Sequence, residues 1–507
     1  MAQIDQSDWI ARWALYRPDH IAVEEAETGR TLTYSQLERA GNALSAHLVM
    51  DHGLQQGDRI VILAENCLEY VAFFTAAQKT GTILVPLNYR LAAPEITYLI
   101  DNSDPKLIIV EDQFRHLLDA LPPDHQRQIF PLAAPRRLIE AHKDTPGEPF
   151  PAVTVQEDDP LFILYTSGTT GFPKGAIYSW KMVVWNSFNT AISLILNTES
   201  RTINCMPPFH TGGWNVLLTP FLHHGAYTCL MKKFDPKQVL RLLEEKQATL
   251  FMAVPTMLRM IADEPEFSRA DFGPLMYLIV GGEPMPIPLI EVWDRQGVPV
   301  RQGYGLTEVG PNLFSLHQDD AMKKKGSIGR SNFYVQTRIV DDQGQDVPPD
   351  TPGELWLKGP MVTPGYWRNE EATRKNITDG WFHTGDIVRE DPDHYFYVVD
   401  RIKNMFISGG ENVYPAEIER VLVSHPEVAA VAVIGVPDDR WGEVGYAFVQ
   451  AASTDLTELE IMDYCRTQLA KFKVPKYVKL VEDIPKNDTG KIDKRRLEEW
   501  AKETNNR

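Results

Sequence analysis

The stretch YTSGTTGFPKGA, Tyr165 to Ala176, follows the apolar run LFILY and decides how the rest of the chain is interpreted. Its glycines let the backbone turn tightly and approach a ligand with free N–H groups. Four hydroxyl side chains and one lysine add further donors: Thr166, Ser167, Thr169, Thr170 and Lys174. This composition predicts a loop that binds a polyphosphate.

The loop departs from the Walker motif, G-x-x-x-x-G-K-[ST]. Lys174 follows Pro173 rather than a glycine, and precedes Gly175 rather than Ser or Thr. A solvated Gly/Ser/Thr linker is the alternative interpretation. A linker has little need of a Pro-Lys-Gly anchor directly after a strand-like run. The loop therefore indicates a phosphate ligand and leaves the reaction open.

The composition of the whole chain narrows its class. A chain of 507 residues is too long for one hydrophobic core, so about two to four folding units are expected. Its 43% hydrophobic and 24% charged residues are typical of a soluble globular protein. No apolar run is long enough for a transmembrane helix, and the first residues carry acids and no apolar core of the signal-peptide type. We expect a cytoplasmic protein.

Charge and cysteine usage exclude other classes. The net charge of −18 argues against a nucleic-acid partner, because phosphate backbones require the opposite sign. It does not exclude ATP, which local donors and a metal ion can bind. The four cysteines are scattered without a C-x-x-C pair, so neither disulfides nor a zinc site is favoured.

The first half of the chain alternates helix-like and strand-like patterns. TYSQLERAGNALSAHL opens with Thr33 and Gln36 at capping-box spacing, which predicts a helix. RIVILAE follows as a buried strand, then an apolar helix from about Leu68 to Gln78, then TILVPL as another strand. Such alternation predicts parallel sheets with crossover helices.

The pattern changes twice further along. Residues 326–399 contain short strand-like pieces punctuated by Gly, Pro and Asp-Gln-Gly, which predict hairpins and a small β-rich unit. After Asp400, VAAVAVIGV and YAFVQA predict strands, and TELEIMDYCRTQLAKF predicts a helix opened by a capping box from Thr457 to Glu460. The tail is therefore expected to be a compact α+β domain.

Four later stretches are polar and specific: QGYGLTE (302–308), GWFHTGD (380–386), DRIKNMFISGGENVYPAEIE (400–419) and PKNDTGKIDKRRL (485–497). Each alone has an ordinary interpretation as a turn, a linker or a basic surface run. In their order, together with the first loop, they resemble the core motifs of the adenylate-forming superfamily. That superfamily comprises acyl-CoA synthetases, the adenylation domains of peptide synthetases and beetle luciferases.

The resemblance implies an α/β fold. It predicts a large N-terminal domain, 1–399, of parallel-rich sheets with crossover helices, which includes the β-rich subdomain 326–399. A hinge at 400–403 then leads to a small, mobile α+β C-terminal domain, 404–507. The hinge position of the family matches Lys403, a charged residue that suits a place where backbone torsions change.

The resemblance also implies the chemistry. A carboxylic acid has a pKa near 4 and is ionised at neutral pH, so it needs alignment with the α-phosphate of ATP and relief of charge repulsion rather than a general base. Glu308 and Thr166 are expected to hold Mg²⁺, and Asp386 to accept from the ribose hydroxyls. The implied catalytic residues are Lys491, Glu308, Thr307 and His210.

The expected ATP-binding residues fall in six places along the chain. They are Thr166, Ser167, Gly168, Thr169, Thr170, Gly171, Lys174, Gly282, Glu283, Pro284, Gln302, Gly303, Tyr304, Gly305, Thr307, Asp386, Arg401 and Lys491. By resemblance, Tyr304 lies against adenine, and Lys491 reaches the carboxylate and the bridging oxygen. In the second half-reaction the acyl group passes to CoA, whose pantetheine arm is expected along Ser408, Gly409 and Gly410.

The stretch MPPFHTGGWNVLLTP (206–220) bears on the identity of the acid. Amino-acid-activating relatives place an Asp near this point, and here His210 follows Phe209 with no acid nearby, so an amino acid is disfavoured. Trp214 matches a bulky residue at the mouth of the acyl tunnel, although a core tryptophan is the alternative. The expected acyl-binding residues are His210, Trp214, Gly281 and Gly303.

Two positions depart from the relatives. Glu283 is polar where many carry alanine, and Ile407 replaces a lysine of luciferases and coumarate ligases, which disfavours both activities. The sequence thus predicts an ATP-dependent acid–thiol ligase for a medium- or long-chain fatty acid. Three alternatives remain: an aryl- or branched-acid CoA ligase, an acyl-AMP-forming enzyme that loads a carrier protein, and an inactive nucleotide sensor. A homodimer is also left open.

Overall fold

The computed structural model describes the chain from residue 8 to residue 505 apart from residues 127, 167–172, 409–410, 439, 454–455, 470 and 488–491. The chain forms two compact units. The first comprises Met1–Met285, Leu289–Gln336 and Leu357–Phe382. The second comprises Pro286–Pro288, Thr337–Trp356 and His383–Arg507. The division into 1–399 and 404–507, with a hinge at 400–403, stays a prediction.

The first unit contains three sheets with parallel strands, as the alternating sequence pattern predicts. The largest has the order β6-β5-β3-β4-β7-β8, with β7 and β8 antiparallel and the other neighbours parallel. Its strands are β3 (Arg59–Leu63), β4 (Ile83–Pro86), β5 (Leu107–Val110), β6 (Ile129–Pro131), β7 (Pro160–Thr166) and β8 (Lys174–Ser179).

The other two sheets of the first unit mix parallel and antiparallel pairs. One has the order β2-β1-β10-β9, and the other β11-β12-β13-β14-β15. The strands of the former are β1 (Ile21–Glu25), β2 (Thr31–Thr33), β9 (Arg201–Asn204) and β10 (Tyr227–Leu230). Those of the latter are β11 (Leu250–Ala253), β12 (Tyr277–Val280), β13 (Val300–Leu306), β14 (Gly310–Ser315) and β15 (Arg330–Ser331).

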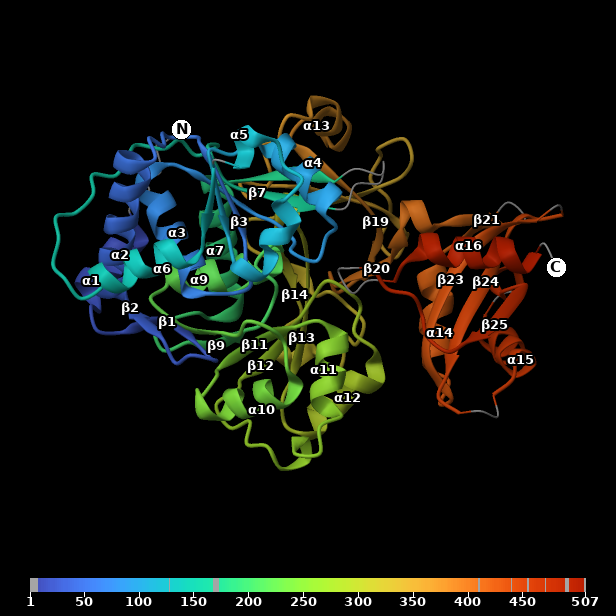
Figure 1. Cartoon of the computed structure of the whole chain (residues 1–507). Helices are drawn as coiled ribbons and strands as arrows, with labels where there is room; N and C mark the ends of the chain where they lie inside the picture. The colour runs from blue at the N-terminus through green and yellow to red at the C-terminus, as the bar shows by residue number, and fades with distance from the viewer. Residues whose placement is uncertain are drawn as a thin grey trace. The chain divides into compact units, whose positions relative to one another are not determined.

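Helices separate these strands along the chain, and α10, α11 and α12 lie beside β11–β13 (Figure 1). They are α1 (Trp9–Tyr16), α2 (Tyr34–Ala46), α3 (Leu68–Thr80), α4 (Ala93–Ser103), α5 (Pro123–Gln126), α6 (Ala133–His142), α7 (Trp180–Leu194), α8 (Thr211–Trp214), α9 (Leu218–His223), α10 (Pro236–Glu245), α11 (Pro255–Ala262) and α12 (Ile287–Arg295). No helix among the described residues is long and apolar enough to cross a bilayer.

The predicted hairpin strands after residue 326 are present. They form a sheet of order β16-β17-β19-β18 in which β20 also pairs with β19. Its elements are β16 (Gln336–Val340), β17 (Gly353–Lys358), β18 (Ile377–Thr378), β19 (Trp381–Glu390) and β20 (Phe396–Arg401), with α13 (Glu370–Asn376) before β18.

The tail is α+β, as predicted. Its sheet has the order β22-β21-β24-β23, and β25 pairs with β24; α14, α15 and α16 lie beside it (Figure 1). The elements are β21 (Phe406–Ser408), β22 (Glu411–Val413), α14 (Pro415–Val423), β23 (Val428–Asp438), β24 (Gly442–Ala451), α15 (Glu458–Gln468), β25 (Tyr477–Val481) and α16 (Lys494–Asn505). The predicted capping boxes at Thr33 and Thr457 are both formed.

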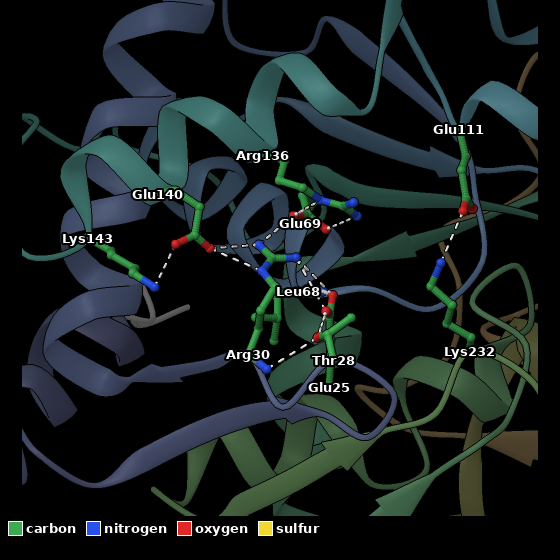
Figure 2. A network of polar contacts seen from close by, with 10 residues as sticks. All are labelled: Glu25, Thr28, Arg30, Leu68, Glu69, Glu111, Arg136, Glu140, Lys143 and Lys232. Atoms are coloured by element: carbon green, nitrogen blue, oxygen red, sulfur yellow. Dashed lines mark hydrogen bonds and ion pairs between the residues drawn. The ribbon is translucent and has the colours of Figure 1, made fainter.

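Helix α3 is buried along its whole length, including its charged residues. Figure 2 shows how the charge of Glu69 is matched: Arg30 Nη2 lies 2.8 Å from its Oε1, and Arg136 Nε lies 2.9 Å from the same oxygen. Glu25 accepts the backbone N–H of Leu68 at 3.0 Å and so binds the start of the helix. Burial opposes ionisation of Glu69, but hydrogen bonds from Arg136 and Arg30 outweigh it and hold its pKa below the ordinary value.

Candidate active site

The predicted phosphate-binding loop joins two neighbouring strands of the large sheet. Strand β7 ends at Thr166 and β8 begins at Lys174, and these two residues are paired across the antiparallel ladder. Five of the predicted loop residues lie outside the described residues: Ser167, Gly168, Thr169, Thr170 and Gly171. The two ends of the loop are therefore fixed side by side, and their side chains can be examined.

Thr166 and the predicted metal ligand Glu308 lie close together. Glu308 follows β13 on the short 3₁₀ turn η4 (Thr307–Val309), and Thr166 Oγ1 donates to its Oε1 at 3.4 Å. Both side chains are half-buried. Hydroxyl and carboxylate oxygens suit Mg²⁺, which is commonly held by one or two carboxylates plus substrate phosphates. The pair therefore fits the cation that the sequence predicts.

The described residues contain no group of three or more His, Cys, Asp or Glu side chains that could hold a metal ion alone. Among them, a divalent cation at Glu308 would therefore need oxygen ligands from elsewhere, and the phosphates of a nucleotide provide such ligands. This donor set favours a metal that arrives with its nucleotide over a permanently bound one.

Tyr366, which no sequence motif indicated, lies among three of the predicted residues: Glu308, Thr166 and Lys174. Its hydroxyl donates to Glu308 Oε1 at 3.0 Å, the same oxygen that Thr166 contacts. Lys174 Nζ lies 5.6 Å from the centre of its ring. Burial, and then the carboxylate of Glu308, raise the pKa of Tyr366, so the phenol keeps its proton and remains a donor.

The backbone around Tyr366 holds it in place. The residue forms an isolated antiparallel bridge with Ala176 in β8, and the nearby Thr363 N–H donates to the carbonyl oxygen of Glu308 at 2.8 Å. Tyrosine at position 366 is not a residue type that by itself indicates phosphate chemistry. The only local sign is a Gly-Tyr pair, Gly365–Tyr366, after β17, which by itself predicts an ordinary turn.

The predicted adenine and acyl residues converge at the ends of β12 and β13. These strands are parallel, with Val280 opposite Gln302. Gly281, Gly282, Glu283 and Pro284 follow the first strand, and Gly303, Tyr304 and Gly305 lie in the second. The Tyr304 ring meets Phe314 edge-on at 5.7 Å. A Cβ at Gly305 would lie 2.3 Å from the Pro311 backbone, so only glycine fits there.

His210 and Trp214 lie at opposite ends of the short helix α8. His210 is the N-cap residue, and its ring lies 4.8 Å from that of Phe209. Trp214 is 1% exposed, and its indole N–H donates to the carbonyl oxygen of Pro208 at 2.7 Å. Its ring packs against Tyr70, Phe74 and Phe162 at 5.0–5.9 Å.

These contacts are those of a core tryptophan, the alternative that the sequence left open. The acyl-binding role of Trp214 stays a prediction, and its burial weighs against a position at the mouth of a tunnel.

In the second unit, Asp386 and Arg401 face each other across β19 and β20. Arg401 Nε donates to Asp386 Oδ1 at 3.0 Å, and the Asp386 side chain is almost fully buried. The pair was predicted to bind the ribose of ATP. A buried carboxylate held by one arginine suits an acceptor for hydroxyl groups.

Lys403 lies exposed in the 3₁₀ turn η6 (Ile402–Asn404), and Ser408 ends β21 and is buried. Gly409, Gly410 and Lys491 lie outside the described residues. At the first position of the predicted hinge, 400–403, the buried Asp400 accepts from three donors. They are Arg401 N at 2.6 Å, Asn404 Nδ2 at 3.0 Å and Ala416 N at 2.8 Å. Asp400, also missed in the sequence, therefore ties this turn to the start of α14.

The hairpin of β7 and β8, the contact of Thr166 with Glu308 and the glycines beside Tyr304 fit the predicted nucleotide site. The chain belongs to the AMP-binding enzyme family: the family's main domain matches residues 10–367, and the AMP-binding enzyme C-terminal domain matches residues 417–491. Because its relatives are acid–CoA ligases, the chain is an AMP-forming acid–CoA ligase.

Several relatives share more than a third of their residues with this chain, and two of them act on different classes of acid. A feruloyl-CoA synthase from Amycolatopsis sp is 38% identical over 96% of both chains. The long-chain-fatty-acid–CoA ligase FadD13 from Mycobacterium tuberculosis is 37% identical over 97% of both. Among solved structures, o-succinylbenzoate CoA synthetase from Bacillus subtilis, in complex with ATP and a magnesium ion, has a TM-score of 0.83, with 29% identity over 97% of this chain and 99% of that one.

Proposed function

We propose that this protein adenylates a medium- or long-chain fatty acid with ATP and then transfers the acyl group to CoA, releasing pyrophosphate and AMP. The observation that carries the first step is the contact of Thr166 and Tyr366 with one oxygen of Glu308, beside Lys174. The similarity to FadD13, across 97% of each chain, supports the choice of acid.

In the first half-reaction a carboxylate oxygen attacks the α-phosphorus, and the bond from that phosphorus to the bridging oxygen breaks. No proton moves, because the acid is already ionised. Bound at Glu308 and Thr166, Mg²⁺ would neutralise phosphate charge during this exchange. Lys174 supplies a positive charge at the pyrophosphate end, and Tyr366 keeps the carboxylate of Glu308 oriented.

Of the remaining predicted residues, most bind a substrate and Lys491 acts in catalysis. Asp386 accepts from the ribose hydroxyls while Arg401 holds its carboxylate, and Tyr304 lies against adenine. Lys491 stabilises the charge that develops on the bridging oxygen. In the second half-reaction the sulfur of CoA attacks the acyl carbon, AMP leaves, and the thiol loses its proton. Ser408, with the glycines that follow it, borders the pantetheine path.

An aryl acid is the second candidate substrate. The feruloyl-CoA synthase is as similar to this chain as FadD13 is. The sequence favoured a fatty acid because Trp214 was expected at the mouth of an acyl tunnel, and the burial of Trp214 weakens that argument. A side chain that is packed among three aromatic rings cannot turn aside for a passing chain without leaving a cavity.

Pyrophosphate release with and without CoA, measured with butanoate, octanoate, palmitate, benzoate and ferulate, tests both candidates. If the substrate is a fatty acid, we expect the highest kcat/KM with octanoate or palmitate. We expect AMP release and thioester formation only when CoA is present. Turnover of ferulate or benzoate without palmitate activity would establish the aryl alternative. Full pyrophosphate release without any dependence on CoA would overturn the acyl transfer.

A further inference from the structure

The outward face of helix α7 is apolar. No residue from Met182 to Thr198 is charged, although charged residues make up 24% of the chain. On this helix Phe188 is 39% exposed and Ile192 is 42% exposed, and Ile195, directly after it, is 61% exposed. Their spacing of four and three residues places them on one side of the helix.

The buried side of α7 carries polar residues, Asn186 and Thr190 among them, beside apolar ones such as Val183 and Leu194. Asn186 Nδ2 donates to the carbonyl oxygen of Asn215 at 2.6 Å, and Thr190 Oγ1 accepts from Asn312 Nδ2 at 2.5 Å. A surface helix of a monomeric protein normally has polar residues on its outward side, whereas α7 has Phe188 and Ile192 there. The outward side of α7 is therefore built to contact something other than water.

The apolar surface extends beyond both ends of α7. At one end, Trp185 lies 4.9 Å from the ring of Tyr334, which is 43% exposed and follows Phe333, 76% exposed. At the other end, Arg17 and Glu199 form an ion pair at 2.8 Å. This pair brings the end of α1, with Tyr16 77% exposed, next to the segment that follows α7.

We propose that this surface is the interface of a homodimer, in which α7 packs against α7 of a second copy. The α7 face is defined by Tyr16, Phe188, Ile192, Ile195, Phe333 and Tyr334. With about 200 Å² for each side chain, their exposed fractions amount to about 700 Å². That area exceeds the usual apolar patch of a monomer and is close to the ~800 Å² that each partner buries in a standard interface.

A second copy fits this face better than a membrane does. Lipid-binding helices carry Lys and Arg beside their apolar side, and here the stretch from Met182 to Thr198 has neither. An apolar helix face can pack against the same face of a second copy across a two-fold axis, because the side-chain ridges of each helix then fit the grooves of the other. The charge of −18 on each copy acts at long range and is screened beyond about 10 Å in salt.

The experiment measures the mass of the wild-type protein in solution by sedimentation, over a range of concentrations. We expect a dimer for the wild type, and a dissociation constant raised at least about tenfold in Phe188→Glu. Phe333→Glu, at a more exposed position of the same face, should behave alike if the first variant fails to fold. Met50→Glu is the matched control, since Met50 is an exposed apolar residue outside the face, and it should remain dimeric.

A wild type that is monomeric at every concentration overturns the proposal, as does a dimer that both glutamate variants leave unchanged. Sedimentation with phosphatidylcholine vesicles is the second arm. Binding of a monomeric wild type to these vesicles, lost in Phe188→Glu and kept in Met50→Glu, would show that the face contacts lipid instead.

Discussion

Removing the hydroxyl of Tyr366 should weaken the binding of Mg²⁺ and leave the fold intact. The phenol donates to Glu308 Oε1 at 3.0 Å, and its raised pKa keeps it protonated across the working range. Tyr366→Phe deletes this donor but keeps the ring beneath Lys174 Nζ. The change therefore isolates one hydrogen bond to the predicted metal ligand.

The size of the effect follows from what that bond does. A hydrogen bond to a charged group contributes about 1.5–3 kcal/mol. Loss of a partner that orients a metal ligand typically costs about 10–100-fold in metal affinity, which corresponds to about 1.4–2.7 kcal/mol. Thr166 contacts the same oxygen at 3.4 Å, too long to replace the lost donor. We expect the Mg²⁺ concentration for half-maximal activity to rise about 10–100-fold.

The assay is acid-dependent ATP–pyrophosphate exchange as a function of free Mg²⁺. Tyr227→Phe is the matched control, because Tyr227 also donates to a glutamate, Glu24, but between β10 and β1. That variant should lose stability without any change in its Mg²⁺ dependence. Tyr366→Leu should raise KM for ATP as well, since it also removes the ring beside Lys174.

An unchanged Mg²⁺ dependence in Tyr366→Phe would refute the reasoning. So would an equal shift in Tyr227→Phe, because the effect would then report stability rather than the orientation of Glu308. A fall in kcat at saturating Mg²⁺, with the half-maximal concentration unchanged, would place Tyr366 in a different role.

Three further predictions concern the catalytic lysine, the hinge and the core. Lys491→Ala should abolish acid-dependent ATP–pyrophosphate exchange, while transfer from pre-formed acyl-adenylate to CoA stays within about tenfold, or roughly 1.4 kcal/mol; equal loss of both steps would contradict two separate conformations. Lys403→Pro fixes φ near −65°, so adenylation should persist while thioester formation collapses, and unchanged overall turnover would argue against a hinge there. Glu69→Gln removes the buried anion that pairs with Arg136 and Arg30. Because Arg30 keeps Glu25 and Glu140, the free energy of unfolding should fall by about 1.5–3 kcal/mol, the contribution of hydrogen bonds to a charged group, in urea titrations at neutral pH. Because the folded-state pKa of Glu69 is lowered, the stability that its carboxylate contributes is complete above about pH 4.5 and is lost as the pH falls below that value. Glu69→Gln should lack this part of the acid sensitivity of unfolding. An identical pH profile of stability in the variant and the wild type would contradict a charged, stabilising Glu69.

Elements with local signals could be predicted from the sequence. The capping boxes at Thr33 and Thr457 form as expected, because a cap depends on residues within one helical turn. The alternation of strands and helices also gave parallel sheets, since each crossover must return to the same sheet.

Helix α3 shows where a local pattern is insufficient. The apolar pattern predicts a helix from about Leu68 to Gln78, and Gln78 and Lys79 interrupt the apolar run at its end. The helix is nevertheless buried on every side, and the Lys79 ammonium is paired with Asp8 and Glu38. The partners of a buried charge lie far along the chain, so one sequence does not reveal them.

The residues of the candidate site also fall into those that a local motif indicates and those that only the fold reveals. The roles of Glu308 and Lys174 are predictions that the sequence alone could make, because each residue lies in a motif that carries its own chemistry. Tyr366 and Asp400 could not, because each acts through contacts that only the fold creates. Tyr366 is separated from Glu308 by 58 positions, and Asp400 from Ala416 by 16. Neither tyrosine nor a single aspartate in a turn distinguishes such a role from ordinary packing.

The position of Trp214 constrains any fatty-acid substrate. Rotation of its indole would break the hydrogen bond to Pro208, which contributes about 1 kcal/mol. It would also vacate a site among three aromatic rings, and the cost of emptying such a site by truncation is about 3–5 kcal/mol. A gate with that energy would slow entry by more than a hundredfold, since about 1.4 kcal/mol is tenfold in rate. A long acyl chain would therefore have to follow a path that leaves the indole of Trp214 in place.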